Sequence, residues 1–260
     1  METLTGAVRD RAVALTREAG AIAMRHFRSD LRSWEKTPGA VVTEADLAID
    51  RFLRERLPAA GEAWLSEESA DDRRRLETER VWIVDPIDGT RSFVAGRPEF
   101  AISVALWSTD RIVLGIVFNP ATDELFVAEH RGGLARNGIA AGLRPWQSSD
   151  EIELLVSGRE AREVGFDRHF ATATVRRLGS LAYRVARVAS GRADGVVSLR
   201  TVADWDLAAA ALMVEEGGGR ITDRHGHPLR FNAWPPSHDG LVVAAPPLHD
   251  ALHDVLERIR

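Results

Sequence analysis

The chain has 260 residues, enough for one large domain or two small ones, and its 45% hydrophobic and 28% charged residues are typical of globular proteins. It contains no cysteine, which excludes disulfide scaffolds, thiolate zinc sites, iron–sulfur clusters and cysteine nucleophiles. The net charge of −5 provides no general attraction for nucleic acid or an anionic membrane. Any bound metal must therefore have oxygen or imidazole ligands.

The N-terminal twenty residues carry acids and bases every few positions, so they lack the apolar core of a signal peptide. No window approaches 18 consecutive apolar residues, the length that a transmembrane helix needs. We therefore expect a cytoplasmic protein with no membrane association and no nucleic-acid partner.

Helical and extended patterns alternate along the chain. An outer helix is predicted over residues 3–28, and a second from Thr43 to Leu57, with Thr43 as its N-cap. Five β-branched and aromatic runs predict strands at residues 63–67, 81–85, 100–107, 111–118 and 124–129, the last three as an antiparallel meander. The second half predicts helices at 180–190 and 206–216, strands at 196–199 and 241–245, and a final helix. This alternation predicts a layered α/β fold with antiparallel strand pairs.

Two polar stretches bear on the domain organisation. Residues 71–80 are the most polar run and are expected to form a solvated loop or short helix. The stretch 141–149 contains proline and tryptophan and is a candidate subdomain junction. We expect one domain over residues 1–260, with candidate subdomains 1–142 and 143–260.

The segment 81–93 is the densest in unusual residues. An apolar strand ends at Asp85, where Pro86 is expected to stop it, and Asp88 follows three positions later. After Gly89 a helix can begin at Thr90, and its first amides favour an anion such as phosphate. Carboxylates beside a phosphate would repel it unless a cation lay between them, which favours magnesium on oxygen ligands. The alternative is a simple turn, since Asp-Pro and Asp-Gly pairs commonly mark turns.

Further acidic residues lie at other element ends. Glu67 and Glu68 lie at the end of a predicted strand. Because adjacent residues on a strand face opposite ways, at most one of them is a straightforward metal ligand. The alternative is a solvated acidic turn. Asp206 opens an alanine-rich helix, where an acid is most often a cap. Lys36 is the one lysine among 34 basic residues. Either a site there needs a compact ammonium group, or the lysine was retained by chance.

Together these motifs resemble the magnesium-dependent, lithium-sensitive phosphatases related to inositol monophosphatase. The resemblance rests on the Glu67-Glu68 pair, on DPIDGT at 85–90 with Phe93, and on WDLAA at 205–209 leading to Gly218. It runs nearly end to end, with VVTEAD at 41–46, GIVFNP at 115–120, LARNG at 134–138 and LGSLAYRVARVASGRADG at 178–195. It implies an αβαβα sandwich with mixed, largely antiparallel sheets, and a homodimer.

The resemblance also implies roles for individual residues. The implied metal ligands are Glu67, Asp85, Asp88, Asp206 and the Ile87 carbonyl. Thr90 and Asp46 would flank the nucleophilic water with Glu67, and Lys36 would lie near the metal cluster. The phosphate would be held at Gly89 and Thr90, and the substrate pocket would include Asp88, Gly179, Ser180 and Asp206. Two magnesium ions could then bind phosphate, activate water and stabilise the leaving alkoxide.

The sequence departs from the pattern of inositol-specific relatives at two places. Ser92 precedes Phe93 where asparagine is frequent, as in some histidinol-phosphate members. The run 196–203 has no acid to hold a ring hydroxyl and offers Arg200, which is either solvated or binds a second phosphate.

The sequence therefore predicts a magnesium-dependent hydrolase of a small phosphorylated metabolite, such as inositol 1-phosphate or a related sugar phosphate. The alternatives are a histidinol-phosphate phosphatase, a 3′(2′),5′-bisphosphate nucleotidase, or a non-catalytic regulatory protein with an RNA or transcription-complex partner. The complete ligand set and the acidic net charge favour the enzyme.

Overall fold

A computed structural model describes residues 6–29, 31–37, 40–147, 151–164, 169–170 and 173–257. The predicted helix start at residues 3–5, Pro38 and Gly39 of the loop around Lys36, and the end of the candidate junction at 148–149 lie outside the described residues. No helix of the described part is long and apolar enough to cross a membrane.

The N-terminal half is built on a seven-stranded sheet. Its strands, in spatial order, are β3 (Ala63–Ser66), β4 (Arg80–Asp88), β5 (Ala101–Ser108), β6 (Arg111–Asn119), β7 (Glu124–Glu129), β8 (Gly133–Arg136) and β9 (Ile139–Ala141). Only the β3–β4 pair is parallel, and the β5–β6–β7 meander is confirmed. A hairpin of β1 (Ser33–Thr37) and β2 (Ala40–Thr43) precedes it.

The C-terminal half is built on a five-stranded sheet ordered β11-β10-β12-β14-β13. Its strands are β10 (Ile152–Val156), β11 (Ala173–Arg177), β12 (Gly195–Ala203), β13 (Arg220–Thr222) and β14 (Ser237–Ala244). β10 pairs in parallel with β11 and β12, whereas β14 is antiparallel to both neighbours. The sequence patterns missed several of these short strands.

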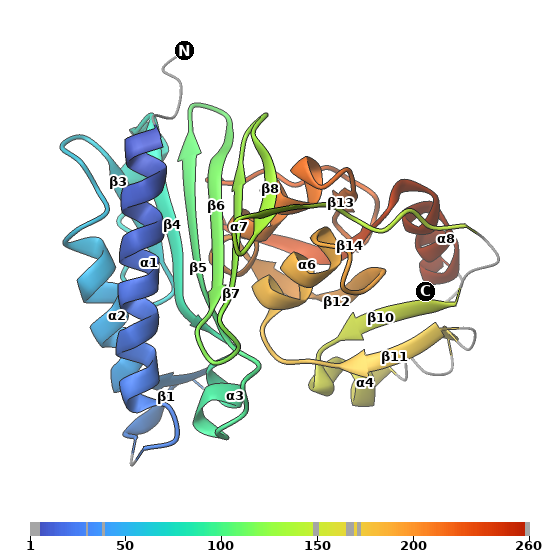
Figure 1. Ribbon diagram of the computed structural model, residues 1–260, viewed down its shortest axis with the longest axis horizontal. Coiled ribbons are helices and arrows are strands. Elements are labelled where there is room, and N and C mark those ends of the chain that lie inside the picture. The colour runs from blue at the N-terminus through green and yellow to red at the C-terminus, as the bar shows by residue number, and fades with distance from the viewer. Residues whose placement is uncertain are drawn as a thin grey trace.

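Helices separate and cover the two sheets (Figure 1). α1 (Gly6–His26) and α2 (Glu44–Arg54) cover the outer face of the first sheet, α6 (Leu181–Ala189) and α7 (Asp204–Glu216) lie between the sheets, and α8 (Pro246–Glu257) covers the second. The shorter helices of the described residues are the 3₁₀ helix η1 (Arg74–Glu77), α3 (Thr90–Val94) and α4 (Gly158–Val164). The layering confirms the predicted αβαβα sandwich.

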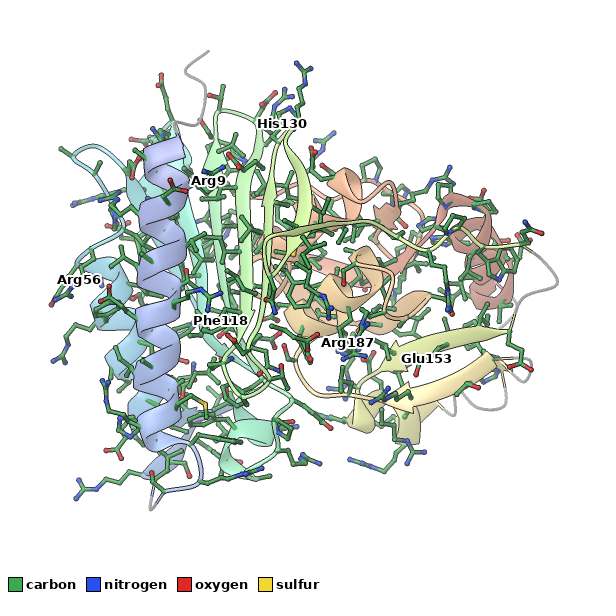
Figure 2. All side chains as sticks on the ribbon, viewed as in Figure 1. Arg9, Arg56, Phe118, His130, Glu153 and Arg187 are labelled. Atoms are coloured by element: carbon green, nitrogen blue, oxygen red, sulfur yellow. The ribbon has the colours of Figure 1, made fainter. Side chains whose placement is uncertain are left out.

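Three apolar cores hold these layers together, because alternate residues of each strand face opposite sides. Trp82 and Val84 pack with α1 and α2, whereas Val81 and Ile83 pack with α6 and α7. Phe118, labelled in Figure 2, lies under α1, where Arg17 stacks on its ring at 5.2 Å. The third core lies between the second sheet and α8.

Several predicted boundaries are wrong. β4 does not stop at Asp85: its ladder is interrupted between Asp85 and Asp88, where Pro86 offers no N–H, and resumes at Asp88. α2 begins after its Thr43 cap as predicted but ends at Arg54. α7 starts at Asp204, so Asp206 lies in its first turn and is not the cap.

The polar run 71–80 contains a residue that is not solvated. Arg75 in η1 is 1% exposed and forms an ion pair with Asp71, with Nη2 2.9 Å from Oδ2. Its Nη1 also donates to Oδ1 of Asn232 at 2.6 Å, so this segment is tied to the C-terminal half.

Candidate functional site

Three carboxylates from separate segments meet at the site. Glu67 follows β3, Asp85 lies in β4, and Asp206 lies in the first turn of α7. One carboxylate oxygen from each lies within 4.8 Å of the others, and no other such metal-binding group of acidic and histidine side chains occurs in the described part of the chain. β3 and β4 run parallel, so both carboxylates emerge at the same end of the sheet, where α7 begins.

The interruption in β4 forms the centre of the site. The backbone N–H of Ile87 donates to Oδ1 of Asp85 at 2.9 Å, which closes a turn around Pro86. Gly89 then adopts a φ of +93°, and a Cβ there would lie 2.8 Å from the Glu99 carbonyl oxygen, so only glycine fits. This turn places Asp85, Asp88 and Thr90 on one short segment.

Asp88 joins this turn to the N-terminus of α6. Its Oδ2 accepts hydrogen bonds from the Ser180 hydroxyl and the Ala182 backbone N–H, both at 2.6 Å. The Ser180 side chain also caps the helix by accepting from the Tyr183 N–H at 3.0 Å. Gly179 lies beside this contact, since a Cβ on it would meet Oγ of Ser92 and the Glu99 carbonyl.

The carboxylate of Asp46 lies beside the Thr90 hydroxyl. The Thr90 hydroxyl is 3.0 Å from the Ile87 carbonyl oxygen and 3.5 Å from Oδ1 of Asp46. Asp46 also accepts from the Thr43 N–H at 2.8 Å and from its hydroxyl, in a capping box at the start of α2. Helix α2 therefore places Asp46 beside the turn at Gly89 and Thr90.

Lys36 lies against the glutamate pair. Its Nζ is 3.1 Å from Oε1 of Glu67 and 2.8 Å from Oε1 of Glu68. The two glutamates do not face opposite ways, because β3 ends at Ser66 and both carboxylates contact one ammonium group. Of the pair, only Glu67 lies in the group of carboxylates that could hold a metal ion. Burial opposes the charge of Lys36, but its bonds to Glu68 and Glu67 raise its pKa overall.

Burial and mutual repulsion dominate the electrostatics of the carboxylates. The pKa values of Asp85 and Asp206 are raised, first by burial and then by their acidic neighbours. Burial raises the pKa of Asp88 to about 6 despite its hydrogen bonds, and that of Asp46 to about 7. So many buried acids in one place disfavour the ionised protein unless a cation is bound.

These residues line a cavity of about 610 Å³ that lies between the two halves of the chain. Its acidic wall contains Glu67, Asp85, Asp88 and Asp206, together with Gly89, Thr90, Gly179 and Ser180. Six arginines from both halves also line it: Arg91, Arg97, Arg159, Arg162, Arg177 and Arg184. Sequence reasoning missed this arginine wall. The signal was Arg184, which falls on the apolar face of the helix pattern of residues 180–190, whereas Arg187 lies one turn later.

The structure does not bring Arg200 to this cavity. The β12–β14 register shifts between Ser198 and Thr201, and Nη2 of Arg200 lies 2.5 Å from Oε2 of Glu163, where both side chains are exposed. Of the two roles considered for Arg200, exposure to solvent is therefore the one observed. The basic residues of the pocket come from other segments.

The family model of the inositol monophosphatase family matches residues 6–260. The chain belongs to this family. It is 37% identical over 233 residues to an inositol-1-monophosphatase of Rhizobium meliloti, covering 86% of this chain and 85% of the relative. Its fold matches the extragenic suppressor protein suhB of Bartonella henselae, with a TM-score of 0.85, 28% identity and coverage of 96% and 98% of the two chains. It also matches an IMPase of Thermotoga maritima, with a TM-score of 0.84, 31% identity and 96% coverage of both chains.

Membership identifies this inositol monophosphatase family chain as a hydrolase of phosphoric monoesters that acts on small phosphorylated substrates and depends on a metal. The family resemblance found in the sequence is therefore confirmed.

Proposed function

We propose that this chain hydrolyses a small phosphate monoester, such as inositol 1-phosphate or a related sugar phosphate, with magnesium as its metal. The observation that carries the proposal is the convergence of Glu67, Asp85 and Asp206, whose ligand atoms lie within 4.8 Å of one another. An all-oxygen donor set suits magnesium. Burial raises the pKa of Asp85 and Asp206, so their ionised forms are favoured only when a dication is bound.

Asp88 and the Ile87 carbonyl are the further ligands of this proposal. Asp88 has one oxygen held by Ser180 and Ala182, which leaves its other oxygen for a metal. When bound, magnesium lowers the pKa of a coordinated water and neutralises charge on the phosphate and leaving oxygens. No covalent nucleophile on the protein is required.

The remaining residues position the water and the ester. The Thr90 hydroxyl, located between Asp46 and the Ile87 carbonyl, orients the attacking water together with Glu67. Lys36 fixes the orientation of Glu67 and Glu68. The first amides of α3, at Gly89 and Thr90, have no partner within the helix and hold the phosphate, while Gly179 and Ser180 form the facing wall.

The proposal also includes the domain organisation, localisation and oligomeric state expected from the sequence. The chain acts as one domain over residues 1–260, as a cytoplasmic homodimer without a nucleic-acid partner. A histidinol-phosphate phosphatase, a 3′(2′),5′-bisphosphate nucleotidase and a non-catalytic regulatory protein are the competing hypotheses.

The test is release of inorganic phosphate from inositol 1-phosphate, histidinol phosphate, adenosine 3′,5′-bisphosphate and fructose 1,6-bisphosphate, with magnesium and with a chelator. Release that needs magnesium supports the proposal, and the preferred compound ranks the competing enzymes. Magnesium binding without release from any of them would overturn the proposal in favour of a regulatory protein.

A further inference from the structure

Arg184 is a buried cation that the proposed chemistry does not use. It lies in the first turns of α6, is 4% exposed, and lines the cavity. Its Nε donates to the Ser180 carbonyl oxygen at 3.2 Å. Among the described residues, its two terminal nitrogens have no hydrogen-bond partner, and Nη1 is shielded from water.

A guanidinium in such a place is costly without an anion, because burial penalises its charge and leaves donors unsatisfied. Burial lowers the pKa of Arg184, opposed by the more distant charges of Glu160, Asp88 and Asp206. Among the described residues no carboxylate is hydrogen-bonded to it, and Glu160, Asp88 and Asp206 act on it only through their charge. Metal bound by Asp88 and Asp206 would further neutralise two of the three compensating charges.

Glu160, the third of these charges, is already engaged. It is 2% exposed, and its Oε1 accepts from the Ser198 hydroxyl at 2.9 Å and the Leu199 N–H at 2.8 Å. Its Oε2 accepts from the Ser157 hydroxyl at 3.1 Å. Glu160 therefore fastens α4 to β12 and leaves Arg184 facing the cavity without a partner from the protein.

The wall around Arg184 is basic as well. Arg177 at the end of β11 and Arg159 and Arg162 on α4 line the same cavity, while Arg91 and Arg97 approach from the segment around α3. In Figure 1, α3 and α4 lie at the same lower edge of the two halves. The cavity therefore has an acidic wall that suits a metal ion and a basic wall that suits an anion, and Arg184 is the member of the basic wall with an unsatisfied buried nitrogen.

We propose that Arg184, with Arg177 and Arg162, binds a second phosphate group of the substrate, so that the preferred ester carries two phosphates. This inference rests on the proposed phosphatase activity and narrows its substrates from phosphate monoesters in general to bisphosphates, so it favours fructose 1,6-bisphosphate or adenosine 3′,5′-bisphosphate over inositol 1-phosphate. One phosphate lies at the metal and is hydrolysed, and the other is held by Nη2 of Arg184 together with the guanidinium groups of Arg177 and Arg162, since Nε of Arg184 is bonded to Ser180 and Nη1 is shielded. A single carboxylate on the substrate would neutralise less of this wall.

The position of Arg184 fits a small bisphosphate. It lies one helical turn beyond Ser180, whose hydroxyl holds the proposed metal ligand Asp88 at 2.6 Å, so the two phosphate sites are joined by a short stretch of cavity. The second phosphate takes no part in bond breaking, so its contacts act equally on bound substrate and transition state. Their loss should raise KM and leave kcat nearly unchanged.

The test uses matched pairs of compounds: adenosine 3′,5′-bisphosphate with adenosine 3′-monophosphate, and fructose 1,6-bisphosphate with fructose 1-phosphate. We expect kcat/KM in magnesium to be at least tenfold higher for the bisphosphate in one pair or both. In Arg184→Met this preference should fall at least tenfold through KM, with kcat changed less than threefold. Replacing a buried, unpaired cation with an apolar side chain should not lower the melting temperature.

The double variant Arg162→Gln/Arg177→Gln provides a second test that does not touch the interior, since both side chains are exposed. We expect it to lower the same preference about threefold or more. Arg176→Gln is the matched control: Arg176 neighbours Arg177 on β11, does not line the cavity, and lies 3.5 Å from Glu153. It should keep the wild-type preference.

The outcomes separate this inference from the function on which it rests. Magnesium-dependent release from every compound with no preference for bisphosphates would overturn the second-phosphate subsite and leave the phosphatase intact. An equal loss for both members of a pair in Arg184→Met would also overturn it, because Arg184 would then support the metal site. No release from any compound, inositol 1-phosphate included, would overturn both.

Discussion

The two walls of the cavity are built in different ways. The acidic wall comes from the ends of β3 and β4 and the first turn of α7, and its side chains are fixed by hydrogen bonds such as Ile87 N–H to Asp85. The arginine wall comes from α3, α4, β11 and α6, with mostly exposed side chains around the buried Arg184. The difference indicates a rigid site for chemistry and a more adaptable one for selecting the substrate.

The largest expected effect comes from breaking the acidic wall. Asp85→Asn and Asp206→Asn should each lower magnesium-dependent phosphate release by about 100-fold or more, because each removes a charged metal ligand. Without metal, both variants should melt at or above the wild-type temperature, since a repelling buried acid is gone. Asp110→Asn, at an exposed residue paired with Arg111, is the control and should behave as wild type. Full activity in folded Asp85→Asn would refute the ligand assignment.

Lys36 should have the next largest effect. Lys36→Met should lower kcat/KM about 10- to 100-fold, because Glu67 and Glu68 lose the ammonium group that orients them. Lys36→Arg keeps the charge but has a larger, planar head group, so it should recover only part of the activity. Steady-state kinetics at saturating magnesium measures both. Wild-type kcat/KM in Lys36→Met would show that the glutamates need no such support.

The pH dependence compares the acidic wall with and without metal. Asp88, with a pKa of about 6, and Asp46, with one of about 7, hold protons in the folded protein that the unfolded chain releases near pH 4. The folded state therefore binds more protons between pH 4 and 7, and the free energy of unfolding of the metal-free protein falls as the pH rises through this window.

Magnesium competes with these protons, so the rise in melting temperature that it produces should grow from pH 5.5 to pH 8. Thermal unfolding with magnesium and with a chelator measures it. A magnesium effect independent of pH would contradict the raised pKa values of the acidic wall.

The smallest effect on activity is expected at Ser180, which links Asp88 of the acidic wall to helix α6, the helix that carries Arg184. Ser180→Ala removes both the helix cap of α6 and a hydrogen bond to Asp88, and should lower the free energy of unfolding by about 1–2 kcal/mol. Activity should fall less than in Asp85→Asn, since the Ala182 N–H still holds Asp88. Denaturant unfolding measures the change; no loss of stability would show that the cap is dispensable. Ser190→Ala, at the opposite end of α6, is the matched control.

The sequence predicted the acidic wall better than the arginine wall for a physical reason. Asp85, Asp88 and Thr90 share one turn, and Glu67 and Asp206 lie at element ends, so local motifs reveal them. Arg184, Arg177 and Arg162 come together only through the packing of α6, β11 and α4.

In a chain with one lysine and 33 arginines, no single arginine stands out by composition. The register shift that turns Arg200 toward Glu163 is likewise invisible to strand alternation. The fold was more predictable, because apolar periodicity marks the long strands and helices of the cores. The short strands were missed because their pairing depends on neighbouring strands: β1, β2, β8, β9, β10, β11 and β13.

The measurement that tests the account most directly is a crystal structure of the protein with manganese in place of magnesium, with the ion located by its anomalous scattering. We predict manganese bound to carboxylate oxygens of Glu67, Asp85 and Asp206 at about 2.0–2.3 Å, distances typical of divalent ions on oxygen. Manganese bound elsewhere, with these three carboxylates free of metal, would contradict the central claim that they form the catalytic metal site.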